Sequence, residues 1–113
     1  LLLAIGMTES SLNRVAVNKA NRNRTIDVGV MQINSCHFSM LSKYTDDLNN
    51  LYSPRFNIHV GAWVLNQCMD KFSGWKAVDC YNKGAGKAQT MSSYVKKVNK
   101  NFKSVYHKNF PDL

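Results

Sequence analysis

The sequence LLLAIGMTESSL, which spans residues 1–12, is the stretch from which the fold is most directly inferred. Leu2, Ile5, Glu9 and Leu12 recur at intervals of three and four residues. This spacing predicts an amphipathic helix over the whole stretch. Glu9 then lies on the apolar stripe of that helix, and it is the only glutamate in the chain.

Glu9 is the first candidate for chemistry. A carboxylate on an apolar stripe loses hydration when it ionises, so the pKa of Glu9 is expected to be raised. A carboxyl group that keeps its proton near neutral pH can act as a general acid. Two other interpretations stay open: the helix is phased differently and Glu9 faces solvent, or Glu9 pairs with Arg14 or a lysine.

The rest of the chain predicts a mainly α fold, or an α+β fold with a small β-hairpin between the first two helices. The polar segment 13–27 is rich in Asn and Arg, which predicts a loop or short hairpin, and 28–33 begins as a strand. A connector is expected over 46–54. Further helices are expected at 35–44, 56–72, 75–81 and 88–106.

Length and charge limit the classes of protein that fit. The 113 residues suggest one domain, 1–113. The chain opens inside an apolar pattern without Met, so we expect further residues upstream of Leu1. The sequence does not show whether a signal peptide is among them. No stretch approaches the ~20 apolar residues of a membrane span. The net charge of +8 favours an anionic partner, although a solvated basic surface explains it equally well. The basic residues are dispersed and match no nucleic-acid signature, so nucleic acid is not an expected partner.

The three cysteines leave two interpretations open. Cys68 and Cys80 lie on helices expected to form a hairpin, so they are able to form a disulfide in an oxidising compartment. Cys36 would then be the odd cysteine, outside that pair. Three buried thiols is the alternative. No Cys-x-x-Cys pair or Cys/His cluster occurs, so no metal is expected, and nothing suggests an organic cofactor.

Three short motifs occur in order along the chain: TESS at 8–11 in the apolar helix, DVGVMQIN at 27–34 and CYNKG at 80–84. Together they resemble the lytic transglycosylase family, whose soluble members have a lysozyme-like α fold. Among its members, the chain is most similar to the small enzymes that accompany type III secretion and conjugation systems. The resemblance runs from about residue 3 to residue 106.

This resemblance implies roles for individual residues. Glu9 matches the catalytic acid/base of the family. Val30 replaces the leucine of the Gly-Leu-Met-Gln motif, and Cys80 replaces the alanine of Ala-Tyr-Asn-x-Gly. Thr90-Met91 replaces the Glu-Thr pair that usually precedes the last motif tyrosine, which puts the contacts on that side of the cleft in doubt. The residues implied in substrate binding are Ser10, Gly29, Met31, Gln32, Tyr81, Asn82 and Tyr94.

The resemblance also implies a reaction and a setting. The substrate would be the glycan strands of peptidoglycan, cut at the β-1,4 bond between N-acetylmuramic acid and N-acetylglucosamine. The muramyl 6-hydroxyl would then close on C1 and leave a 1,6-anhydro end. The expected location is the periplasm, and the expected partner besides the wall is a secretion-system component. A lysozyme-type hydrolase and a non-catalytic docking module remain alternatives.

Asp27 is the second catalytic candidate. It lies 18 positions after Glu9 and leads into the Gly-Val-Met-Gln segment. If that segment faces the cleft, Asp27 approaches the sugar opposite Glu9, as in a lysozyme-type pair of one neutral and one ionised carboxyl group. The alternative is that Asp27 caps a turn or pairs with Arg22 or Arg24.

Overall fold

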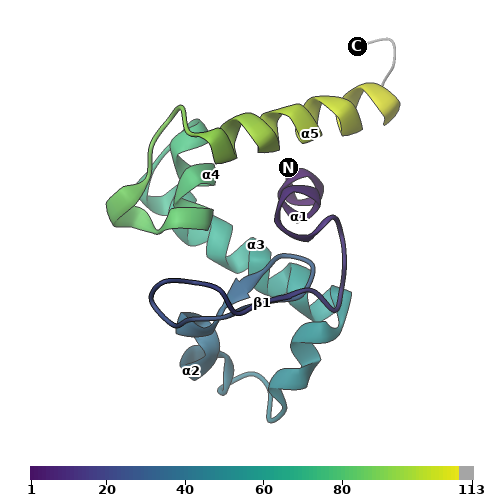
Figure 1. Ribbon diagram of the computed structural model, residues 1–113, viewed down its shortest axis with the longest axis vertical. Helices are drawn as coiled ribbons and strands as arrows, with labels where there is room; N and C mark the ends of the chain where they lie inside the picture. The colour runs from purple at the N-terminus through teal and green to yellow at the C-terminus, as the bar shows by residue number, and fades with distance from the viewer. Residues whose placement is uncertain (110–113) are drawn as a thin grey trace.

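The computed structural model describes residues 1–109 and is mainly helical (Figure 1). One long helix, α3, crosses the middle of the molecule, and α5 passes over α1 on the side opposite the small sheet. The α-helices in residues 1–109 are α1 (Leu2–Ser10), α2 (Phe38–Leu41), α3 (Pro54–Lys71), α4 (Gly74–Lys83) and α5 (Ser93–Asn109). Short 3-10 helices, η1 (Ser35–His37), η2 (Leu48–Tyr52) and η3 (Ala85–Lys87), connect them.

A small antiparallel sheet separates α1 from α2, which confirms the mainly α fold with a minor β element. Its three strands, in the order β1-β2-β3, are Val17–Asn18, Asp27–Val28 and Ile33–Asn34. The segment 28–33 begins as a strand, as expected, but it does not continue as one. A turn at 29–32 divides it into the end of β2 and the start of β3, which pair with each other.

Helix α1 ends earlier than the 1–12 period predicts. Ser11 and Leu12 both have positive φ, at 54° and 63°, and the Ser11 backbone N–H donates to carbonyls of the preceding turn. A residue in the left-handed conformation is a common end to a helix. Leu12 is therefore 46% exposed and does not continue the stripe. Glu9 lies in the last turn of the helix, close to the loop that follows it.

The turn between β2 and β3 is fastened to α3 by the fully buried side chain of Asn57. Its amide group donates to the backbone oxygens of Val28 and Leu51, each at 2.9 Å, and its oxygen accepts from the Met31 backbone N–H at 2.7 Å. A buried amide with all of these bonds made stabilises one arrangement of the turn. Gly61 of α3 leaves room for the Met31 side chain, which a Cβ there would approach to 2.8 Å.

Two other helices differ by more than two residues from their expected bounds. The helix predicted over 35–44 is divided into η1 and α2, which ends at Leu41. The helix predicted to begin at residue 88 begins at Ser93, because the preceding segment is held against α4 by side-chain hydrogen bonds.

Helices α3 and α4 are joined by a disulfide between Cys68 and Cys80, with their Cα atoms 5.8 Å apart. The structure therefore supports the paired interpretation over the three buried thiols. Cys36 is free and exposed. No helix in the described part of the chain is both long enough and apolar enough to cross a membrane.

Candidate active site

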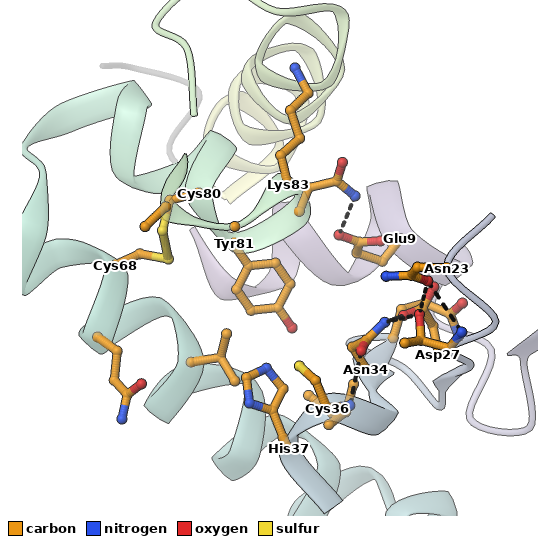
Figure 2. A pocket seen from close by; sticks show the side chains of 18 of the residues that line it. Glu9, Asn23, Asp27, Asn34, Cys36, His37, Cys68, Cys80, Tyr81 and Lys83 are labelled. Carbon is orange, nitrogen blue, oxygen red and sulfur yellow. Dashed lines mark hydrogen bonds between the residues drawn. A yellow bond between two sulfur atoms is a disulfide. The ribbon is translucent and has the colours of Figure 1, made fainter. Parts of the chain in front are cut away.

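A cavity of about 370 Å³ opens between the sheet, the end of α1 and the α3–α4 pair (Figure 2). A cavity of this size is in the range usual for small-molecule sites. Glu9 and Asp27 lie on one side of it, and the disulfide lies on the other. Polar side chains from the sheet and its loops, from α3 and from α4 complete its wall: Asn23, Thr25, Gln32, Asn34, Gln67, Asn82 and Lys83.

The Glu9 carboxyl group is held by one of its two oxygens. The Tyr94 hydroxyl donates to Oε2 at 2.8 Å, and the Asn82 amide donates to the same oxygen at 3.4 Å. No group in residues 1–109 donates to Oε1, and no buried polar side-chain atom there lacks a partner, so Oε1 reaches solvent. Because Oε2 already has two donors, a proton on this carboxyl group belongs on Oε1.

The pKa of Glu9 is raised from 4.5 to about 7. Burial makes the largest contribution, because it removes water from the ionised form. The hydrogen bonds from Tyr94 and Asn82 lower the pKa and offset part of this effect, while the charge of Asp27 raises it slightly. The direction is the one that the apolar stripe predicts. Within residues 1–109 Glu9 forms no ion pair, so the pairing with Arg14 or a lysine is wrong.

Tyr94 is suited to its place beside Glu9. Burial, followed by the nearby charge of Glu9, raises the pKa of its phenol, so the hydroxyl keeps its proton and acts as a donor. The side chain is 8% exposed and reaches Glu9 from the first turn of α5. Although Thr90-Met91 departs from the family motif, the tyrosine that follows still contacts the glutamate.

Asp27 is held by three side-chain amides. Asn18 and Asn21 donate to Oδ2 at 3.2 and 3.0 Å, and Asn34 donates to Oδ1 at 2.9 Å. Asn18 and Asn34 are the residues paired with Asp27 on the two neighbouring strands. In the described chain neither Arg22 nor Arg24 forms an ion pair with Asp27, so the expected alternative of an ion pair is wrong.

The turn at 29–32 contributes Gln32 to the cavity wall, and its other residues lie behind that wall. Gly29 has φ of 81°, and a Cβ there would lie 2.2 Å from the Asn57 amide nitrogen. Met31 is 1% exposed, so its side chain is part of the core. Gln32 reaches the cavity wall, and its amide donates to the Gly29 backbone oxygen at 3.0 Å.

Two further side chains tie this segment to the helices around Glu9. The Ser10 hydroxyl donates to the Val30 backbone oxygen at 2.6 Å. The Tyr81 hydroxyl, which points across the cavity from α4, donates to the Met31 backbone oxygen at 2.6 Å. These bonds fix the turn at 29–32 relative to α1 and α4.

The predicted site residues therefore fall into two groups. Those that line the cavity are Glu9, Asp27, Gln32, Tyr81 and Asn82. Those that lie behind its wall are Ser10, Gly29, Met31 and Tyr94.

Sequence reasoning missed the asparagines that hold Asp27. Asn18 and Asn21 were included only in a polar loop, and Asn34 only in a motif. The only available signal is that asparagines are frequent in the sequence around Asp27. Their contacts with Asp27 depend on the pairing of strands that lie seven to nine residues apart in the chain. Cys36 and His37 also line the cavity, and nothing in the sequence pattern placed them there.

Comparisons with known proteins identify relatives of this chain. The chain is 39% identical over 87 residues to "Protein IpgF" of Shigella sonnei, which covers 74% of this chain and 56% of that protein. It is 33% identical over 109 residues to "Invasion protein IagB" of Salmonella typhimurium (strain SL1344), covering 93% of this chain and 68% of that protein. A "Peptidoglycan-binding-like protein" of Escherichia coli O157:H7 is 32% identical over 92 residues, which covers 74% of this chain and 55% of that protein.

The chain thus spans between about half and two thirds of the length of these relatives. No solved structure was found to match it. Among known families, residues 1–103 match the one described as "Transglycosylase SLT domain". This match confirms the resemblance carried by the three motifs: the chain belongs to the family of lytic transglycosylases with the SLT domain.

Proposed function

We propose that this chain cleaves the β-1,4 bond between N-acetylmuramic acid and N-acetylglucosamine in peptidoglycan, with Glu9 as acid and then base. One observation carries the proposal. The only glutamate of the chain has a pKa of about 7, lines the cavity and presents one oxygen, Oε1, to which no group in residues 1–109 donates a hydrogen bond. Membership of the SLT-domain family supports the same reaction class.

The proposed mechanism uses Glu9 twice. Its neutral carboxyl group gives the proton on Oε1 to the glycosidic oxygen as the C1–O bond breaks, and C1 becomes an oxocarbenium-like centre. The carboxylate that remains takes the proton of the muramyl 6-hydroxyl, whose oxygen bonds to C1 and forms the 1,6-anhydro ring. Proton transfer of this kind contributes about 10²–10⁴-fold to a rate. Because the substrate supplies the nucleophile, no second carboxylate has to attack.

We infer that Asp27 stabilises the positive charge at C1 or orients the reacting sugar. It lies in the same cavity as Glu9, and three uncharged amides hold its carboxyl group in one position. Asp27→Asn should therefore lower turnover severely. Asp46→Asn, which removes the same charge from an exposed position outside the cavity, is the matched control. Near-normal turnover in a folded Asp27→Asn variant would remove this role.

Three further cavity residues are proposed to contact sugar: Gln32, Tyr81 and Asn82. The residues behind the wall would act by holding them and Glu9 in place. Each cavity residue is testable by substitution, and loss of affinity for glycan fragments in a folded variant is the expected result.

A lysozyme-type hydrolase remains the second candidate, because Asp27 shares the cavity with Glu9 as the ionised member of such a pair would. Mass spectrometry of the muropeptides released from purified wall material distinguishes the two. Anhydro ends indicate transglycosylation, and reducing ends indicate hydrolysis. Glu9→Gln should release neither product. If the folded Glu9→Gln variant still cut the wall, the role of Glu9 would be wrong.

The biological setting is also proposed. One relative is named an invasion protein and another a peptidoglycan-binding-like protein. These names support a role for this chain outside the cytoplasm, in the periplasm, where it would open the wall locally for a secretion apparatus and be recruited by one of its components. If Glu9→Gln supported secretion as well as the unaltered chain did, a non-catalytic docking module would be the better description.

A further inference from the structure

The side chain of Asp79, on α4, is completely buried and lies outside the cavity wall. Its Oδ1 accepts a hydrogen bond of 2.5 Å from the Ser92 hydroxyl. Its Oδ2 accepts from the Gln89 backbone N–H at 2.7 Å and lies 3.2 Å from the Lys83 ammonium group. Burial by itself raises the pKa of Asp79, but these bonds and the Lys83 charge together hold it below its ordinary value. The side chain is therefore a carboxylate anion, and both of its oxygens accept hydrogen bonds.

Two of these bonds come from the exposed segment that leads into α5. Residues 89–91 are exposed and have no regular structure, whereas Ser92 is 6% exposed. The Ser92 hydroxyl also accepts from the Val95 backbone N–H at 3.0 Å, which is the usual bond of a residue that caps the start of a helix. Asp79 thus fixes the rotamer of the residue that caps α5.

The position of this contact matters because of what lies on either side of it. Tyr94 follows Ser92 by two residues, and Asn82 follows Asp79 by three residues on α4. Both side chains donate to the same oxygen of Glu9. The Asp79–Ser92 bond therefore sets the separation of the two elements whose side chains meet on Oε2.

We propose that Asp79 is a positioning residue that fixes the first turn of α5 through Ser92 and so holds the Tyr94 hydroxyl on Glu9. This inference deepens the proposed function, since its catalytic consequence depends on Glu9 being the acid. Asp79 itself touches no substrate. Its effect reaches the site through the cap, the first helical turn and one phenol.

The test measures how strongly Tyr94 acts on Glu9 when Asp79 is changed. Because Glu9 is the only glutamate, glutamate labelled with ¹³C at the side-chain carboxyl carbon gives one carboxyl resonance whose titration reports its pKa. Tyr94→Phe is expected to raise this pKa by roughly half a unit to one unit, since it removes a donor to the ionised form. In an Asp79→Asn background the same substitution should have less than half that effect, because the bond is already loosened.

Asn101→Ala is the matched control. It removes a hydrogen bond of 2.9 Å from α5 to the Thr8 hydroxyl, and so weakens the docking of α5 without touching its first turn. In this background Tyr94→Phe should keep its full effect on Glu9. A purely structural role for Asp79 would leave the Tyr94→Phe effect equal in all three backgrounds, and that result would overturn the proposal.

If Asp79→Asn does not fold, Ser92→Ala takes its place as the background. It breaks the same connection without removing a charge, and Ser92→Thr, which keeps the hydroxyl group, should restore the Tyr94→Phe effect. An undiminished effect in folded Ser92→Ala would equally overturn the proposal. The titration needs no substrate, so a failure to cut peptidoglycan would count against the proposed function and not against this connection.

Discussion

Replacing Glu9 by Gln should make the protein more stable at alkaline pH, even though it removes the proposed catalytic group. In the folded chain the Glu9 pKa is about 7, against 4.5 for an unperturbed glutamate. Between these values the folded state binds the proton more tightly than the unfolded state, so stability falls as pH rises. Below pH 4.5 the carboxyl group is neutral in both states and carries no penalty. Above pH 7 the penalty is complete.

The size of the effect follows from the shift. At 1.36 kcal/mol per pKa unit, the full shift corresponds to roughly 3 kcal/mol of lost stability above pH 7. Partial solvation of the half-buried side chain makes this an upper limit, so we expect about 1–3 kcal/mol. For a domain of this length, 1 kcal/mol corresponds to about 4 °C in the unfolding midpoint. Glu9→Gln should therefore raise the midpoint by about 4–12 °C at pH 8.

The assay is unfolding by urea or heat at pH 4 and pH 8, with the disulfide intact. The difference in free energy of unfolding between Glu9→Gln and the unaltered chain should be near zero at pH 4 and reach its full value at pH 8. Asp46→Asn, which removes a carboxylate from an exposed position outside the cavity, is the control variant. A difference that stays the same at both pH values would refute the claim that Glu9 is sheltered, and the acid role with it.

Three other substitutions or treatments test separate parts of the structure. Tyr94→Phe should move the alkaline limb of the pH–rate profile to higher pH. Loss of its hydrogen bond raises the pKa of Glu9, so the carboxyl group keeps its proton to a higher pH. Reduction of the Cys68–Cys80 disulfide, which closes a short loop, should lower the free energy of unfolding by about 3 kcal/mol in a urea titration. An unchanged transition would mean that the bond contributes nothing to stability. Gly29→Ala should lower the free energy of unfolding by more than about 2 kcal/mol in the same titration, since it adds a methyl group at positive φ against a buried amide. A loss below about 0.5 kcal/mol would contradict the packing described.

The part of the site that the sequence predicts best is the part with a regular local pattern. Glu9 follows Leu2 and Ile5 on one helical face, and the spacing places it correctly although the helix stops at Ser10. The pattern does not show where the helix ends, because Ser11 adopts a left-handed conformation that non-glycine residues seldom adopt.

What the sequence does not predict depends on contacts between distant residues. The start of α5 is set by Ser92, whose hydroxyl is bonded to Asp79 thirteen residues earlier, so helical periodicity in 88–106 gives a start that is too early. The surroundings of Asp27 likewise depend on strand pairing, and two-residue strands leave almost no periodic signal. The disulfide depends on the angle between α3 and α4, which spacing alone left open.

The three amides around Asp27 have a consequence for how the protein responds to its ionic surroundings. An arginine clamp would weaken as added electrolyte screens it, but dipolar amide donors are affected far less. The attraction between a chain of net charge +8 and an anionic polymer is strongly weakened by added electrolyte, because it acts over long distances through solvent, where counter-ions screen it. Concentrated electrolyte should thus slow the approach to the cell wall and leave the geometry around Asp27 intact.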